Sequence, residues 1–378
     1  MMNNSSPNLH NKIDACMHCG LCIETCPTYR ASGIESDSPR GRLLLMRAAN
    51  ENRLANSDIQ DALNRCVQCH ACETSCPSNV QYHELLVEHL PPRNNFVGKV
   101  MASKTMSSIA GVIVRFGAKL KLNKLPGVFA LLPDKAHAFS SAQTVYPAAG
   151  ELRAKVGVHL GCVESQIYAD VIDDLIAVFT HQGFELHFAD QPSCCGAIHA
   201  HNSDLKSGNQ LAAQTSDAFI EFDNVITLSA GCSAHLQTNS SQARFLDPLV
   251  FLAENGLRGQ IQQLDSKIAW VVPCHLLHLQ QNWQAISKML SGIPGVELLD
   301  FKDSDLCCGA GGSQLISQPQ LVQQMGREKS KSLIASGAEE ILVSNSGCRL
   351  QIDRHLRAQQ HTHQSKHPLQ LLRLALGV

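Results

Sequence analysis

The sequence has few aromatic residues and no long apolar run. Phe, Trp and Tyr make up 5% of the 378 residues, and no uninterrupted apolar stretch approaches the roughly eighteen residues that a membrane-spanning helix needs. The N-terminal residues are polar and lack the apolar centre of a secretory signal. The formal net charge is only −2, so no global field favours nucleic acid as a partner. We therefore expect a cytoplasmic chain without transmembrane helices.

A glycine motif for nucleotide binding is also missing. No G-x-G-x-x-G follows a predicted strand, and the GAGG at 309–312 belongs to a cysteine motif. We expect no flavin and no NAD on this chain. Without a cofactor that oxidises a substrate, the chain is expected to act as one subunit of a larger enzyme.

Cysteine is present in excess, with sixteen residues. Such a number indicates either disulfides in a secreted protein or metal ligation in a reducing compartment. The cysteines fall in tight, repeated clusters and no secretory signal is evident, so the pattern favours metal ligation.

The first eight cysteines form two copies of C-x2-C-x2-C-x3-C-P, fifty residues apart. This run is typical of two-cluster ferredoxins, in which the fourth cysteine of each motif binds the other cluster, whereas zinc sites usually show two separated C-x2-C pairs. We therefore predict two [4Fe-4S] clusters. Their ligands would be Cys16, Cys19, Cys22 and Cys76 for one cluster, and Cys66, Cys69, Cys72 and Cys26 for the other.

The middle of the chain, residues 91–150, differs in charge from its flanks. It holds eight Lys or Arg residues and one acid, Asp134, which gives +7 against −9 for the rest of the chain. The segment is interpreted as a basic linker that wraps the domains. The alternative is docking onto a membrane surface or a partner.

The remaining residues contain an internal repeat in three blocks. Residues 155–162 match 267–274, 193–196 match 306–309, and 224–232 match 340–348, at offsets of 112, 113 and 116. Short β-branched runs alternate with helical patterns such as 165–180 and 318–336, which predicts parallel βα units. The predicted fold is α+β: a mostly helical two-cluster ferredoxin-type domain at 1–90, then a pseudo-two-fold pair of α/β cysteine-rich domains at 151–262 and 263–378.

Each half of the repeat carries a lone cysteine, a Cys-Cys-Gly and a Gly-Cys. Because the offsets hold across all three blocks, we predict that the four cysteines of each half converge at strand ends, where open α/β sheets form their binding crevice. A metal or redox site is one interpretation, and buried free thiols are the other. The candidate third site comprises Cys162, Cys194, Cys195, Cys232, His235, Cys274, Cys307, Cys308 and Cys348.

The chain resembles the iron–sulfur subunit of glycolate oxidase (glycolate dehydrogenase) along essentially its whole length. The segment 26–42 (CPTYRASGIESDSPRGR) and the residues 80–83 that follow the second motif carry this resemblance. The cysteine-rich halves are also similar to those of heterodisulfide reductase, anaerobic glycerol-3-phosphate dehydrogenase and lactate-utilisation proteins. In heterodisulfide reductases each motif ends C-x2-C, whereas His235 and Gln351 occupy the last position here. His235 makes the first half the better candidate for a third metal centre.

The resemblance implies a function and its partners. Glycolate would be oxidised to glyoxylate on FAD-containing dehydrogenase subunits, and this chain would pass electrons to a quinone or another acceptor, with the complex peripheral on the inner face of the cytoplasmic membrane. The alternatives are the same role for D-lactate or glycerol 3-phosphate, thiol–disulfide chemistry at the Cys-Cys-Gly site, and a zinc-stabilised scaffold. The histidines at 355, 361, 363 and 367 are expected on a solvated helix face.

Overall fold

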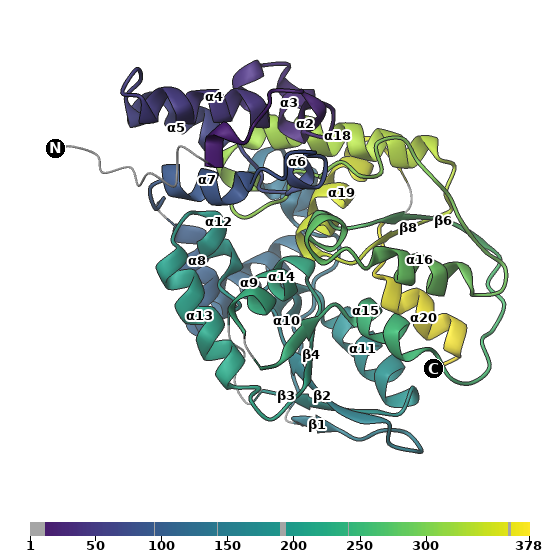
Figure 1. Cartoon of the computed structure of the whole chain (residues 1–378). Helices are drawn as coiled ribbons and strands as arrows, with labels where there is room; N and C mark the ends of the chain where they lie inside the picture. Colours follow the sequence, from purple (N-terminus) through teal and green to yellow (C-terminus); the bar gives the residue numbers. More distant parts are fainter. Residues whose placement is uncertain (1–11, 94, 142, 190–193, 241, 362–363) are drawn as a thin grey trace.

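The computed structural model describes residues 12–378 apart from 94, 142, 190–193, 241 and 362–363. A helical N-terminal unit lies across one end of two α/β halves (Figure 1). The fold is α+β, as predicted, and its two small sheets belong to the two halves of the repeat. Within the described part of the chain, no helix has both the length and the apolar character needed to cross a bilayer.

The N-terminal unit consists of short helices around a small core of Ile13, Met46, Ile59 and Leu86. Its longest helix begins at Pro39, where Ser38 caps the Gly41 N–H and Pro39 occupies the first turn. The elements are α2 (Leu21–Glu24), α3 (Pro27–Ser32), η1 (Glu35–Asp37), α4 (Pro39–Asn50), α5 (Asn56–Asn64), α6 (Ala71–Thr74) and α7 (Tyr82–His89).

The described residues between 91 and 150 form helices and one short strand. The strand pairs antiparallel with β3 (Phe184–Phe188) of the first half, through Val145 opposite His187. The elements are α8 (Phe96–Ala102), α9 (Lys104–Lys119), η2 (Leu122–Lys124), η3 (Gly127–Leu131) and β1 (Val145–Tyr146).

The first half is built on a five-stranded sheet in the order β1-β3-β2-β4-β5, parallel except for β1. The predicted helix at 165–180 is divided, because Tyr168 leaves the helical backbone conformation between two helices. The elements are β2 (Ala154–His159), α10 (Glu164–Ile167), α11 (Ala169–His181), β3 (Phe184–Phe188), α12 (Ala197–His201), α13 (Leu205–Asp217), β4 (Asn224–Thr227), α14 (Ala230–Asn239), β5 (Arg244–Leu246) and α15 (Pro248–Asn255).

The second half repeats this plan around a three-stranded parallel sheet, β7-β6-β8. Strands β6, β7 and β8 correspond to β2, β3 and β4, which gives the pseudo-two-fold relationship expected from the repeat. The elements are β6 (Ser266–Val271), the π-helix η4 (His275–Gln280), α16 (Trp283–Ser291), β7 (Val296–Leu298), α17 (Gln314–Ser317), α18 (Pro319–Ala335), β8 (Glu340–Val343), α19 (Ser346–Ala358) and α20 (Pro368–Leu376).

The two halves exchange their last helices. Helix α15 of the first half packs on α16 of the second, and α20 of the second packs on α11 of the first (Figure 1). Arg373 on α20 forms an ion pair with Asp174 on α11, with a 2.9 Å N–O distance. Apolar residues of all four helices belong to one continuous core, so the halves share their interior.

Candidate iron–sulfur and cysteine sites

The two ferredoxin-type loops adopt the same backbone course. His18 and Gln68, which follow the first cysteine of each motif by two residues, both have positive φ angles of 55° and 52°. Gly20 and His70, two residues further on, are also left-handed and immediately precede α2 and α6. Left-handed backbone at non-glycine residues costs about 1 kcal/mol or more and is found where structure around a site imposes it. The backbone of both loops therefore curves around the cavities that their cysteines line.

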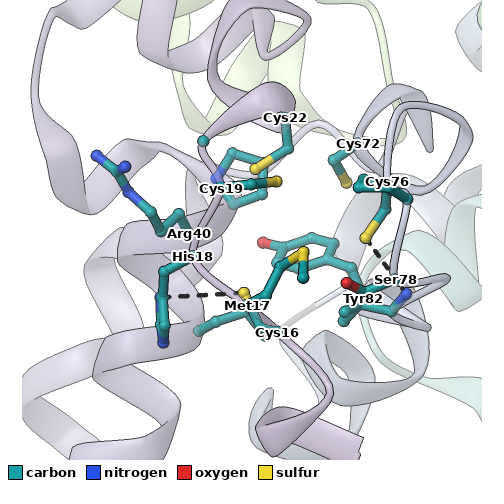
Figure 2. Close-up of a pocket in the computed structure, with 15 residues that line it drawn as sticks. Cys16, Met17, His18, Cys19, Cys22, Arg40, Cys72, Cys76, Ser78 and Tyr82 are labelled. Atoms are coloured by element: carbon teal, nitrogen blue, oxygen red, sulfur yellow. Dashed lines mark hydrogen bonds between the residues drawn. The ribbon is translucent and has the colours of Figure 1, made fainter.

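A first cavity opens between the two loops (Figure 2). Cys19 and Cys22 of the first loop face Cys72 and Cys76 of the second across it, and Cys16 completes the lining. The backbone N–H of Val80 donates to Cys76 Sγ at 3.4 Å. All four predicted ligands of one cluster, three from the first motif and one from the second, thus line one cavity.

A second cavity is lined by Cys26, Cys66, Cys69 and Cys72, the four predicted ligands of the other cluster. The backbone N–H of Gln68 donates to Cys66 Sγ at 3.4 Å. The structure therefore places the fourth cysteine of each motif with the first three of the other. Their assignment as iron ligands remains a prediction.

The two cavities are neighbours. Pro39, Cys72 and Tyr82 line both of them. The Tyr82 ring is buried, and burial raises the pKa of its hydroxyl well above the ordinary value. This shared wall brings the two predicted cluster positions next to each other.

A buried cation lies beside the second cavity. Arg42 is 1% exposed and lines this cavity. Its Nε donates to the Ala62 carbonyl at 2.8 Å, and its Nη2 donates to Thr28 Oγ1 at 3.2 Å. Thr28 Oγ1 in turn lies 3.2 Å from Cys26 Sγ. The sequence motif SPRGR contained Arg42, but residue spacing alone did not show that its charge would be buried beside sulfur.

The surroundings of these cysteines fit a metal–sulfur cluster. Burial raises the pKa of the Cys22 thiol to about 11 and raises the pKa of Cys66 and Cys72. Thiols of this kind lose their protons when a metal cation binds. The positive charge of Arg42 also favours the thiolate form of Cys66, because it lowers the pKa that burial raises. Among the described residues, no three or more His, Cys, Asp or Glu side chains are arranged to hold a single metal ion. The crossed sets of four cysteine thiols have the ligand type and number of a [4Fe-4S] cluster.

The four cysteines of the first α/β half converge. Cys195 Sγ lies 2.8 Å from Cys232 Sγ, and Cys194 accepts hydrogen bonds from Cys162 and Cys195. These two bonds, with a further one from the Gly196 N–H, lower the pKa of Cys194 far below that of an ordinary thiol. The site thus has one sulfur that favours the thiolate form.

The second half repeats the arrangement. Cys308 Sγ lies 3.0 Å from Cys348 Sγ, and hydrogen bonds from Cys274 and Cys308 lower the pKa of Cys307. The N–H of Gly309 adds a bond to Cys307 Sγ at 3.4 Å. Gly309 and Gly196 both have positive φ, at 88° and 81°, which explains why glycine follows each Cys-Cys pair.

His235 and Gln351 differ in the way the sequence suggested. His235 has a buried Nε2 without a hydrogen-bond partner among the described residues. Burial lowers the pKa of its ring, and the charge of Cys194 partly opposes this effect. Gln351 instead donates through Nε2 to the Val322 carbonyl at 2.5 Å and helps to pack α18 on α19. The first half therefore has a ring nitrogen within electrostatic reach of Cys194, whereas the corresponding side chain of the second half is already engaged.

The second cavity of the N-terminal unit adjoins the cysteine site of the second half. Cys69 and Val67 share a small apolar cluster with Cys307, Cys274 and Met325. Cys307 is close enough to Cys69 to raise its pKa further, beyond the effect of burial.

Histidine rings gather at this junction, with His70 and His275 centroids 6.2 Å apart and His201 and His275 centroids 5.3 Å apart. The sequence did not predict this meeting, because the residues lie far apart in the chain.

The expectation of a solvated histidine face near the C-terminus was wrong for two residues. His355 and His367 are buried, and burial lowers their pKa values to about 4 and about 3. His367 Nδ1 caps α20 by accepting the Leu369 N–H. His363 lies outside the described residues.

Comparison with known proteins agrees with this division of the chain. Residues 12–80 match the 4Fe-4S dicluster domain, and residues 156–237 and 268–353 each match the cysteine-rich domain. The chain belongs to the iron–sulfur proteins that join a 4Fe-4S dicluster domain to two cysteine-rich domains.

Several relatives of known name resemble the chain over much of its length. The glycolate oxidase iron-sulfur subunit of Escherichia coli (strain K12) is 29% identical over 89% of this chain and 88% of its own. The probable glycolate oxidase iron-sulfur subunit of Bacillus subtilis (strain 168) is 26% identical over 89% of this chain and 87% of its own. The lactate utilization protein A of Shouchella clausii (strain KSM-K16) is 25% identical over 57% of this chain and 98% of its own. The resemblance to glycolate oxidase subunits stated from the sequence is confirmed.

Proposed function

We propose that this chain is the electron-transfer subunit of a flavoenzyme complex that oxidises glycolate to glyoxylate. FAD-containing dehydrogenase subunits would take two electrons from the substrate, and this chain would carry them to a quinone or another acceptor. The likeness to the named glycolate oxidase subunits supports the substrate. The observation that carries the relay is the succession of cysteine sites: two cavities with a shared wall, the second of which adjoins Cys274 and Cys307.

In this proposal the eight cysteines that line the two cavities hold [4Fe-4S] clusters, which supply one-electron carriers when bound. The chain's own residues fix where these carriers lie and how stable each oxidation state is. Left-handed loop residues set the course of the backbone, N–H groups donate to sulfur, and the buried Arg42 guanidinium favours added negative charge.

The complex would lie in the cytoplasm, peripheral on the inner face of the membrane. This location places the relay next to a lipid-soluble acceptor such as a quinone.

Thiol–disulfide chemistry at the Cys-Cys-Gly sites is the second candidate. The low pKa of Cys194 and Cys307 favours it, because the thiolate is the nucleophile in such exchange. Both residues are buried, however, at 7% and 8% exposure. A soluble disulfide substrate would need access that the surface does not give these sulfurs, so we favour the relay.

The test is anaerobic purification of the native complex through a tag on this chain. We expect a brown protein that retains flavin-containing subunits and reduces an artificial acceptor with glycolate. D-Lactate and glycerol 3-phosphate are assayed in parallel. A preference for either would change the proposed substrate but not the proposed electron-transfer role. A complex without iron, or one whose flavin is reduced by substrate while the iron centres stay oxidised, would overturn the proposal.

A further inference from the structure

Helix α9 presents its apolar side chains to solvent. Ile113 and Phe116 are 65% and 62% exposed, and four further large apolar side chains lie on the same exposed surface. The apolar face of α9 comprises Met106, Ile109, Val112, Ile113, Phe116 and Leu120.

The opposite side of α9 faces the protein with small and polar residues. Ser107, Gly111 and Ala118 are buried, and Arg115 donates to the Gln166 carbonyl at 2.8 Å. A helix on the surface of a globular protein normally buries its apolar stripe and exposes its polar one. The apolar face of α9 is therefore left uncovered by the described residues, and an exposed apolar patch of this kind marks an interaction site.

Positive charge lies at both ends of the apolar face. Lys104, Lys119, Lys121 and Lys124 follow one another along α9 and η2, all exposed. The one acid of the segment, Asp134, is already paired with Arg357 at 3.1 Å. An apolar stripe combined with lysines is typical of helices that lie in the interface of an anionic bilayer.

A basic cavity of about 930 Å³ continues from the end of this helix. Lys124 and Leu125, just beyond α9, form one wall, and residues of α18 and α19 form the other. Its cationic lining residues are Lys124, Arg327, Lys331, Arg354 and Arg357, and the described lining residues include no Asp or Glu.

The charge of this cavity is only partly neutralised from within the chain. Arg327 and Arg354 form no ion pair among the described residues, and both depress the pKa of neighbouring His355 in addition to the effect of its burial. The buried His355 Nε2, which lines the same cavity, has no hydrogen-bond partner in the part of the chain that the structure describes. Guanidinium groups without a carboxylate partner, beside a buried nitrogen of this kind, are the groups that would bind a phosphate-containing anion.

We propose that the apolar face of α9 and the basic cavity together form the surface by which this chain docks on an anionic phospholipid bilayer. The apolar side chains enter the headgroup region, and the cavity receives a lipid phosphate. The inference rests on the peripheral membrane location in the proposed function and identifies the residues that produce it. A second copy is disfavoured, because two copies of this face would bring their lysines and arginines against each other. An anionic bilayer supplies both the apolar layer and the negative charge that the surface needs.

The experiment uses the full chain with its clusters reconstituted, floated with vesicles of phosphatidylcholine alone or mixed with phosphatidylglycerol. We expect binding to the mixed vesicles that weakens as salt rises. The double variant Ile113→Glu with Phe116→Glu should lose roughly tenfold or more in vesicle affinity, and Arg327→Glu with Arg354→Glu should lose the preference for phosphatidylglycerol. Ile220→Glu changes an apolar side chain that is 60% exposed elsewhere, and this control should bind as the native chain does.

Several results would overturn the inference. If the native protein does not bind mixed vesicles but does bind inorganic phosphate, the cavity is a site for small anions and not for lipid. A native dimer that the double variant converts to a monomer, without vesicle binding, would make α9 a contact between copies. Iron content, and reoxidation of dithionite-reduced clusters by a soluble acceptor, are measured for every variant in vesicle-free buffer. Their persistence when docking fails separates this inference from the electron-transfer proposal.

Discussion

Ser229 donates a hydrogen bond to Asn345 Oδ1 at 2.7 Å, and these two residues occupy the same position in the two halves of the repeat. Each is the residue before the helix that carries the last cysteine of its half. Asn345 also donates through Nδ2 to Cys348 Sγ at 3.6 Å. The Ser229–Asn345 hydrogen bond therefore joins equivalent positions of the two halves, and Asn345 links this contact to the cysteine site of the second half.

Removing this contact should weaken the junction between the halves. Ser229→Ala leaves Asn345 Oδ1 without its partner in a partly buried position, so we expect a loss of about 1 kcal/mol in the free energy of unfolding. Anaerobic urea unfolding of the iron-loaded chain measures it. Ser291→Ala removes an exposed serine that bonds only within its own helix and is the control. Equal unfolding midpoints for both variants would contradict the role of Ser229.

Each cavity is lined by the first three cysteines of one motif and the fourth cysteine of the other. Replacing a fourth cysteine should therefore remove the cluster of the other motif. Cys26→Ser should remove the cluster of Cys66, Cys69 and Cys72, and Cys76→Ser should remove the cluster of Cys16, Cys19 and Cys22. Iron analysis and EPR of the reduced protein distinguish the two, since each variant keeps the signal that the other loses. If each variant instead lost the cluster of its own motif, the crossed assignment would be wrong.

Arg42 is expected to set the reduction potential of the second cluster. Arg42→Gln removes a buried positive charge, so the more negative, reduced state becomes less stable and the potential should fall by tens of millivolts, on the order expected for a nearby charge. Arg42→Lys keeps the charge and should shift the potential less. Redox titration followed by EPR reads both clusters in one sample, and the cluster of Cys16, Cys19 and Cys22 serves as the internal reference. A shift confined to that cluster would refute the placement.

Asp247 predicts a specific dependence of stability on pH. Burial raises its carboxyl pKa to about 7 from an ordinary value of 3.8, so between these values the folded state binds more protons than the unfolded state. The free energy of unfolding should therefore fall as pH rises from about 4 to about 7, by up to a few kcal/mol. Asp247→Asn retains an oxygen for the Leu249 N–H and should abolish this part of the pH dependence.

Thermal unfolding at several pH values, under anaerobic conditions, compares native chain and variant. Asp300→Asn, at an exposed carboxyl, is the control and should follow the native curve. A native curve that rises with pH over this window would show that Asp247 is charged at little cost in the folded state.

Much of the cysteine chemistry could be predicted from the sequence, because ligand spacing is local. The C-x2-C-x2-C-x3-C-P runs identified both loops, and the strands around Val156, Ile226, Ile268 and Leu342 were recognisable by their β-branched runs. The convergence of four sulfurs in each half followed from the repeat, since matching strand ends meet at the same edge of a parallel sheet.

The parts that escaped prediction depend on contacts between distant residues. The apolar residues of α9 have helical periodicity, but periodicity does not show which side faces the protein. His355 and His367 looked like part of a polar run, and only the packing of α19 and α20 buries them. The charge of Arg42 could not be placed, because the carbonyl of Ala62 and the hydroxyl of Thr28 that hold it come from other elements.

The exchange of α15 and α20 between the halves is consistent with an origin by duplication of a half that once formed a dimer. A single half standing alone would leave the apolar side of α11 or α16 uncovered, since the helix that covers it is supplied by the other half. Two identical copies could cover each other, as in a domain-swapped dimer. The present chain carries both copies in one polypeptide, so this mutual covering no longer depends on protein concentration. Each half is then free to change its own cysteine site, as His235 and Gln351 show, without losing the partner that keeps it folded.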